Sequence, residues 1–269
     1  MNKIKTILRV VVIIWRQFYQ DNCFNRAAGL AYTTLLSLVP LLSVGFSILF
    51  AFPVYHDLAQ KIQDLIFTYI VADSAQVVQQ YFLNFIAQTP KLSIFGMAGL
   101  LITAVWLVFS MEQTFNNIWR VNRNRHSITA FLLYWAIISL IPIVIASLFS
   151  ISSSLAGLEK FIGIPFQPIE ALVTIILPYI ATFMAFALLY LSLPNCKVPI
   201  GNAVIAAIIA TILFELARHA FALYIDNIAG YTLIYGALAA IPIFLVWLYI
   251  SWVIILLGVV INHVLTKSV

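Results

Sequence analysis

The chain has 269 residues, of which 64% are hydrophobic and only 9% are charged, and its net charge is +5. Soluble domains carry roughly 25% charged residues, because a water-facing surface needs charge. The composition therefore excludes a soluble globular domain and indicates one integral membrane domain over residues 1–269. The two cysteines, Cys23 and Cys196, belong to no Cys-x-x-Cys or Cys/His cluster, so we expect no metal and no cofactor.

Residues 1–26 are expected to form a retained N-terminal helix on the cytoplasmic side. Apolar and basic positions alternate over residues 4–20, and the apolar run at 10–15 is too short to cross a bilayer. Arg9 interrupts the apolar core and no small-x-small cleavage site follows, which argues against a signal peptide. Two arrangements remain open: an interfacial helix whose cations meet anionic headgroups, or a helix packed on the bundle.

Six later stretches are long and apolar enough to cross a membrane. We expect these transmembrane helices at 27–52, 94–119, 130–155, 171–193, 199–225 and about 233–265. Prolines inside them remove backbone hydrogen bonds and predict kinks. These prolines are Pro40, Pro142, Pro178 and Pro242. Between the first two spans, residues 53–93 place apolar side chains at helical spacing, which predicts short amphipathic helices in a periplasmic loop. The expected fold class is thus an all-α polytopic membrane helix bundle.

Lysine and arginine are distributed unequally between the two sides of this bundle. With the N-terminus inside, the cytoplasmic segments carry Lys3, Lys5, Arg9, Arg16, Arg26, Arg120, Arg123, Arg125, Lys197 and Lys267. The outer segments carry only Lys61, Lys91 and Lys160. The positive-inside rule therefore predicts that both termini are cytoplasmic. It also places both cysteines on the reducing side, so we expect no disulfide.

The six spans also divide into two halves of three. Corresponding spans carry similar residues: Pro40 and Pro178, Glu112 and Glu215, and Pro142 and Pro242. With three spans in each half, the second half would be inverted relative to the first, as in many secondary transporters. Proline is also common in membrane helices, so coincidence is the competing interpretation.

The fifth span contains three polar residues within one apolar run. Glu215, Arg218 and His219 stand at i, i+3 and i+4, so they share one helical face. A charge inside hydrocarbon is costly and usually faces the interior of the bundle. This face could contact a substrate headgroup or relay a proton. Alternatively, the Glu215–Arg218 pair could be an ion pair that only fixes the helix against its neighbours.

Four other residues complete the hypothetical intramembrane polar site. Glu112 and Asn116 share a face near the cytoplasmic end of the second span, where their side chains could instead extend to the headgroups. Tyr231 and Tyr235 stand at the outer boundary, where aromatic belts are common. The site we predict comprises Glu112, Asn116, Glu215, Arg218, His219, Tyr231 and Tyr235.

Four stretches carry a family resemblance: AAGLAYTTLLSLVPLL at 27–42, EQTFNNIWRV at 112–121, FELARHAFALY at 214–224 and YGALAAIPIFLVWLYISWVIILLG at 235–258. Together they resemble the YihY/BrkB family of bacterial inner-membrane proteins, historically described as ribonuclease BN. The resemblance implies a six-span protein of the bacterial inner membrane, and it implies no settled biochemical activity. It supplies no agreed catalytic residues.

The sequence argues against the ribonuclease activity. Metal-dependent RNA hydrolysis needs Asp, Glu or His side chains clustered around a cation. The histidines stand singly, at His56, His126, His219 and His263, and no P-loop is present. We therefore expect that the protein is not an enzyme and has no specific nucleic-acid partner.

Two function classes remain. The first is a transporter, or a translocator of lipid or another envelope component, with membrane lipids as partners and a lipid or small amphiphile as substrate. The second is a non-transporting scaffold or regulator of envelope assembly. A cavity that reaches Glu215 would favour the first class, and a tightly packed bundle would favour the second. The sequence specifies no oligomeric state.

Overall fold

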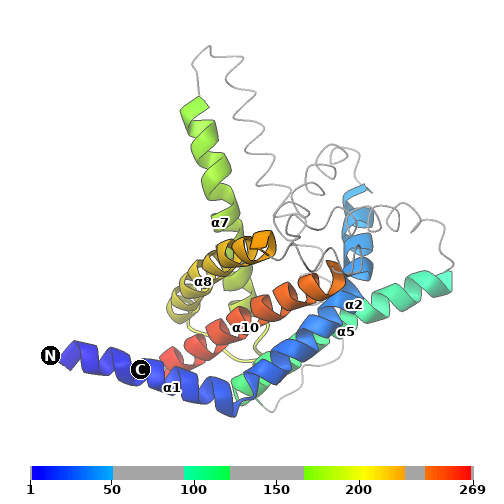
Figure 1. Ribbon diagram of the computed structural model, residues 1–269. Helices are drawn as coiled ribbons and strands as arrows, with labels where there is room; N and C mark the ends of the chain where they lie inside the picture. Colours follow the sequence, from blue (N-terminus) through cyan, green and yellow to red (C-terminus); the bar gives the residue numbers. More distant parts are fainter. Residues whose placement is uncertain (1, 51–93, 122–166, 228–239, 268–269) are drawn as a thin grey trace.

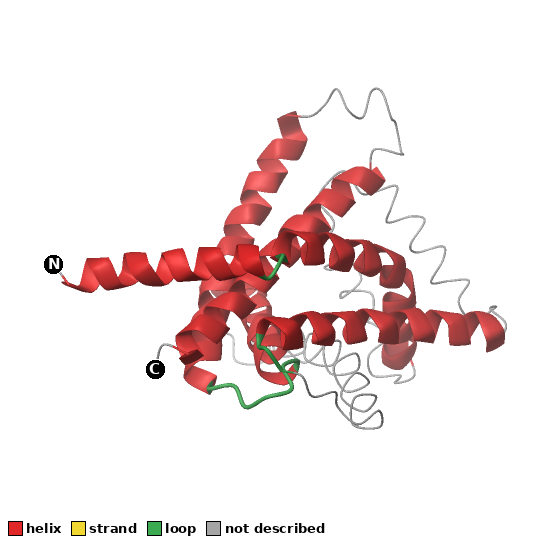
Figure 2. Ribbon diagram, turned by 90° about the horizontal axis from the view of Figure 1, so that it is seen from below, coloured by secondary structure: helices red, strands yellow, loops and turns green. Residues whose placement is uncertain are grey.

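The computed structural model describes residues 2–50, 94–121, 167–227 and 240–267. Six helices and no strand are present in these ranges (Figures 1 and 2). The helices are α1 (Asn2–Gln20), α2 (Cys23–Phe50), α5 (Ile94–Ile118), α7 (Gln167–Ser192), α8 (Ile200–Asn227) and α10 (Ala240–Lys267). The described part of the chain is therefore all-α, as predicted.

Five of the six expected spans fall on α2, α5, α7, α8 and α10. The span expected at 130–155 and the loop at 53–93 lie outside the described residues. Within the described residues, Ile200–Ile225 and Ile241–Lys267 have the length and mean hydropathy, 2.1 and 2.7, of membrane-crossing helices. The total of six spans stays a prediction.

Within the described part of the bundle, α10 is the central helix. It packs against α2 and α8, and it also contacts α1, α5 and α7. Figure 1 shows it running between α2 and α8. Every residue from Gly258 to Val264 is buried. This part of α10 has no outward face because neighbouring helices surround it, which explains why its sequence is apolar almost all round.

A close approach joins α7 to α10. Tyr190 is 1% exposed, and its hydroxyl donates a hydrogen bond of 3.2 Å to the carbonyl oxygen of Ile255. A Cβ atom added at Gly258 would overlap the hydroxyl and ring of Tyr190. The absent side chain of Gly258 is therefore what lets the tyrosine lie against the backbone of α10, in the manner of small residues at membrane helix contacts.

One end of the bundle gathers segments that are distant in sequence, and we call it the polar end. It comprises residues 16–26, 112–121, 193–202 and 262–267. Four side-chain contacts join these segments: Asp21–Arg120, Asn116–Asn195, Gln17–His263 and Asn202–Thr266. The lysine and arginine distribution predicts that these four segments lie on the same side of the membrane. Their common location agrees with the predicted topology, while the identity of that side as cytoplasmic stays a prediction.

The end of the N-terminal helix packs on the bundle, while a place for this helix at the membrane interface stays a prediction. Phe18 is buried, and its ring lies 5.0 Å from that of Phe24, so the end of α1 packs on the bundle. In contrast, Val12, Trp15 and Tyr19 are 64%, 61% and 71% exposed. These three residues stand at i, i+3 and i+7 and form an exposed apolar stripe. Such a stripe is what an interfacial helix presents to lipid.

Candidate functional site

Glu215 and Arg218 meet directly on α8. Nη2 of Arg218 lies 2.7 Å from Oε2 of Glu215, and the two side chains are 26% and 12% exposed, respectively. Ile212 and Leu216, which flank Glu215 on the helix, are exposed apolar residues. The ion pair is therefore neither sealed inside the bundle nor fully open. It lies at the margin of an apolar surface suited to lipid.

The packing of α8 explains this half-buried position. The ring of Trp247 on α10 lies 5.3 Å from that of Phe214 and 5.2 Å from that of Phe221. Arg218 shares a helical face with these two phenylalanines, because it stands four residues after the first and three before the second. The ion pair therefore lies beside the aromatic contact between α8 and α10.

The ion pair is far from the polar end. Glu215 follows Ile200, the first residue of α8, by fifteen residues, which corresponds to roughly 22 Å along the helix axis. The hydrocarbon core of a bilayer is about 30 Å thick. A membrane-crossing α8 would therefore place the pair in the leaflet remote from the polar end. His219 lies one turn beyond Glu215 and is exposed.

Glu112 and Asn116 belong instead to the polar end. Glu112 is 5% exposed, so the expectation that its side chain could extend to the headgroups is wrong. Nδ2 of Asn116 donates to Oε1 of Glu112 at 3.4 Å, and Oδ1 of Asn116 accepts the backbone N–H of Asn195 at 2.7 Å. The α7–α8 connection thus contacts α5 at Asn116, one turn from the buried Glu112. The structure does not unite this pair with Glu215.

The other predicted site residues have different outcomes. Tyr231, Tyr235 and Pro142 lie outside the described residues. Pro40 is inside α2, Pro178 is inside α7, and Pro242 stands in the first described turn of α10. The kinks expected at these prolines stay predictions.

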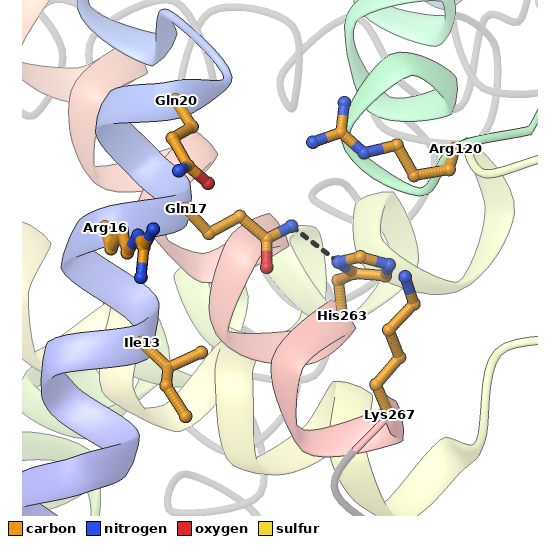
Figure 3. Close-up of a pocket in the computed structure, with 7 residues that line it drawn as sticks. All are labelled: Ile13, Arg16, Gln17, Gln20, Arg120, His263 and Lys267. Atoms are coloured by element: carbon orange, nitrogen blue, oxygen red, sulfur yellow. Dashed lines mark hydrogen bonds between the residues drawn. The ribbon is translucent and has the colours of Figure 1, made fainter.

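A hollow of about 340 Å³ opens at the polar end, between α1, the end of α5 and α10 (Figure 3). Its lining residues are Ile13, Arg16, Gln17, Gln20, Arg120, His263 and Lys267. Figure 3 shows side chains from α1 facing Arg120, His263 and Lys267 across the hollow. Its volume falls within the range of small-molecule sites, roughly 300–1,000 Å³.

A buried carboxylate orders one wall of this hollow. The side chain of Asp21 is 3% exposed, and its Oδ1 lies 2.6 Å from Nη2 of Arg120. Its Oδ2 accepts a hydrogen bond of 3.3 Å from Nε2 of Gln17. The same Gln17 nitrogen lies 2.6 Å from Nδ1 of His263. One network therefore connects α1, the end of α5 and α10.

The backbone also fixes Arg120. Its φ is 58°, in the left-handed region that favours glycine. Its N–H donates to the carbonyl oxygen of Asn117 at 3.2 Å, and the N–H of Val121 donates to that of Asn116 at 2.9 Å. This pattern is a Schellman motif, which usually carries glycine where Arg120 stands. An arginine there costs roughly 1 kcal/mol, but it places a guanidinium beside Asp21.

Sequence reasoning did not identify this hollow. Gln17 and Asp21 stand at i and i+4, and Arg120 directly follows the second expected span, so a common side could be inferred. Which of the nearby cations pairs with Asp21 depends on tertiary packing, which the sequence pattern does not reveal. His263 lacked any motif that would single it out.

The two cysteines at this end are free thiols. The pKa of the Cys23 thiol is raised to about 12, mainly by burial and also by the charge of Asp21, while Arg26 opposes the shift. Burial also raises the pKa of Cys196. Because the thiolate is the reactive form, both are weak nucleophiles at neutral pH. Among the described residues, no three His, Cys, Asp or Glu side chains gather as metal ligands.

Comparison with known proteins places nearly the whole chain among membrane proteins. The family model described as "Virulence factor BrkB" matches residues 14–269. A UPF0761 membrane protein of Legionella pneumophila is 40% identical over 269 residues, covering 97% of this chain and 64% of the relative. One from Psychromonas ingrahamii is 39% identical over 259 residues, covering 96% of this chain and 88% of the relative. The chain thus spans less than two thirds of the Legionella relative. No solved structure matches it.

Proposed function

The chain belongs to the BrkB family of membrane proteins, and from this premise we propose that it translocates a lipid or another amphiphilic envelope component across the bacterial inner membrane. The Glu215–Arg218 pair is its polar intramembrane site, and no step of this activity is enzymatic. The observation that carries the proposal is the half-buried ion pair at the margin of an apolar surface.

The chemistry of this pair suits an amphiphile. An arginine guanidinium binds phosphate or carboxylate through two parallel hydrogen bonds. Removing one partner of a buried ion pair strands the other charge, which is strongly unfavourable. An anionic headgroup that replaces Glu215 beside Arg218 would avoid a stranded cation while an acyl chain lies against Ile212 and Leu216. The pair could therefore exchange partners without exposing Arg218 alone to hydrocarbon.

The expected proline kinks would allow helices of the bundle to bend during translocation. Pro40 and Pro178 stand inside α2 and α7, the first helices of the two expected halves. Proline frees a carbonyl from the helical ladder and favours bending at that point. In an inverted-repeat transporter, such broken helices border the substrate site. We therefore propose that the two halves of the bundle form a 3+3 inverted repeat.

A scaffold for envelope assembly is the second candidate, and the contact of Tyr190 with Gly258 favours it. This contact and the burial of Glu112 indicate that the bundle is tightly packed at and near the polar end. The two functions differ in what they require of Glu215. A scaffold needs only a folded bundle, whereas translocation needs the charge of the carboxylate.

Complementation of a deletion strain tests this difference. Glu215→Gln keeps the shape and hydrogen bonding of the side chain but removes its charge, so it should fold, insert and fail to restore the envelope phenotype of the deletion strain. The Glu215→Ala/Arg218→Ala double variant should also fail. The double substitution should destabilise the protein less than the sum of the single ones, because neither charge is stranded. Full complementation by both variants at normal expression would make the pair purely structural.

A further inference from the structure

The residues that line the hollow at the polar end carry more positive charge than the nearby carboxylate of Asp21 balances. Arg16, Arg120 and Lys267 line it from three different segments, and none of the described residues that line it is acidic. The buried carboxylate of Asp21 lies 2.6 Å from one nitrogen of Arg120, while the Arg120 side chain remains 59% exposed. Three cations around one hollow suit an anion with several oxygen atoms, as a phosphate group has.

Contacts within the protein fix part of this site. The Schellman motif fixes the backbone of Arg120, and Asp21 holds its guanidinium at 2.6 Å. Gln17 is held between Asp21 and His263. Side chains fixed in advance lose little entropy when an anion binds, which favours affinity.

The surface beside the hollow indicates where the anion comes from. Arg16 and Gln20 line the hollow from α1, and the apolar stripe of Val12, Trp15 and Tyr19 runs next to them on the same helix. Aromatic side chains of this kind favour the headgroup level of a bilayer. A lipid can therefore place its phosphate among the cations while its acyl chains lie along the stripe.

We propose that Arg16, Arg120 and Lys267 bind the phosphate of an anionic phospholipid headgroup at the polar end. This site is separate from the Glu215–Arg218 pair, and it does not depend on translocation. The shared chemistry is a phosphate group, for which free inorganic phosphate is the other source. The apolar stripe beside the cations favours the lipid.

Native mass spectrometry of the purified full-length chain tests the proposal, with dioleoyl phosphatidylglycerol, dioleoyl phosphatidylcholine and inorganic phosphate as separate probes. The wild type should retain phosphatidylglycerol in preference to the other two. Arg16→Gln/Lys267→Gln should weaken phosphatidylglycerol binding by roughly 30-fold, because each Lys or Arg near an anionic membrane contributes a factor of about five. Arg16→Lys/Lys267→Arg should retain most of the binding.

Lys197→Gln is the matched control, because Lys197 is an exposed cation at the same end that does not line the hollow. It should bind phosphatidylglycerol like the wild type. Equal losses in the control and the double variant, or no loss in either, would overturn the site. Equally tight binding of inorganic phosphate would overturn the lipid assignment. Arg16 and Lys267 are both exposed, so the melting temperature of the double variant should equal that of the wild type. If the double variant nevertheless fails to fold, the two single variants replace it, and each should lose less phosphatidylglycerol binding than is expected of the double variant.

Discussion

Asp21 and Arg120, ninety-nine positions apart in the sequence, form an ion pair of 2.6 Å that joins the α1–α2 corner to the end of α5. The two partners have unequal surroundings, since the side chain of Asp21 is 3% exposed and that of Arg120 is 59% exposed. Water can solvate the arginine if the aspartate is lost. The buried carboxylate has no such compensation if the arginine is lost.

This asymmetry predicts an order of stabilities. Arg120→Ala should lower the free energy of unfolding by about 1–3 kcal/mol, because it leaves a buried acceptor without its cation. Asp21→Asn should cost less, since the amide can still pair with Gln17. Adding Asp21→Asn to Arg120→Ala should recover part of the loss, as measured by thermal unfolding in detergent. No recovery would show that the buried charge of Asp21 is not the cause.

The contact between Tyr190 and Gly258 gives a second prediction. Gly258→Ala should destabilise the protein by about 1–3 kcal/mol, because the methyl group would overlap the Tyr190 ring and force α7 and α10 apart. Gly29→Ala is the control, since a Cβ atom there would meet nothing within 4 Å. It should leave the unfolding temperature unchanged or slightly raised. Similar effects of the two substitutions would contradict the close approach seen here.

Much of the fold could be predicted because membrane solvation leaves a strong mark on sequence. A run of about twenty apolar residues has few alternatives to a helix in hydrocarbon. The starts of α5 and α8 accordingly lie within one residue of the expected spans. The earlier start of α2, at Cys23 instead of residue 27, adds four helical residues, and the polar Asn25 and Arg26 among them separate these residues from the apolar run that follows.

The ion pair on α8 could be predicted from the sequence, whereas the arrangement of residues at the polar end could not. Glu215 and Arg218 could be paired from sequence because helical spacing alone brings them together. The burial of Glu112 could not be predicted, since it depends on how other segments pack against α5. The hollow likewise depends on tertiary contacts among three segments. Local periodicity contains no information about such contacts.

The thiols test the predicted topology. A membrane-impermeant maleimide should label neither Cys23 nor Cys196 in intact spheroplasts, because both belong to the end predicted to be cytoplasmic. In opened membranes Cys196 should react faster than the fully buried Cys23. Since its pKa is raised by burial, the labelling rate of Cys196 should rise about tenfold between pH 7 and pH 8, following the thiolate fraction.

Denatured protein provides the control, because both cysteines should then react. Labelling of Cys196 in intact spheroplasts would reverse the orientation of the bundle. A labelling rate that does not change with pH would contradict the raised pKa.

The absence of ribonuclease activity remains a prediction. Highly purified protein should process tRNA precursors no faster than a mock preparation from the same host, because the sequence lacks a recognisable metal-ligand motif. The decisive contrary result would be an activity that survives purification and disappears when a single carboxylate of this chain is replaced.

Lipid movement in reconstituted vesicles tests the central claim most directly. Fluorescent phosphatidylglycerol in both leaflets would be reduced from outside by dithionite, with and without an imposed proton gradient. The wild type and Lys197→Gln should move inner-leaflet lipid outward faster than protein-free vesicles, while Glu215→Gln and Glu215→Gln/Arg218→Gln should fall toward the protein-free rate. Equal rates in wild-type, variant and protein-free vesicles under both conditions would contradict translocation through the Glu215–Arg218 site.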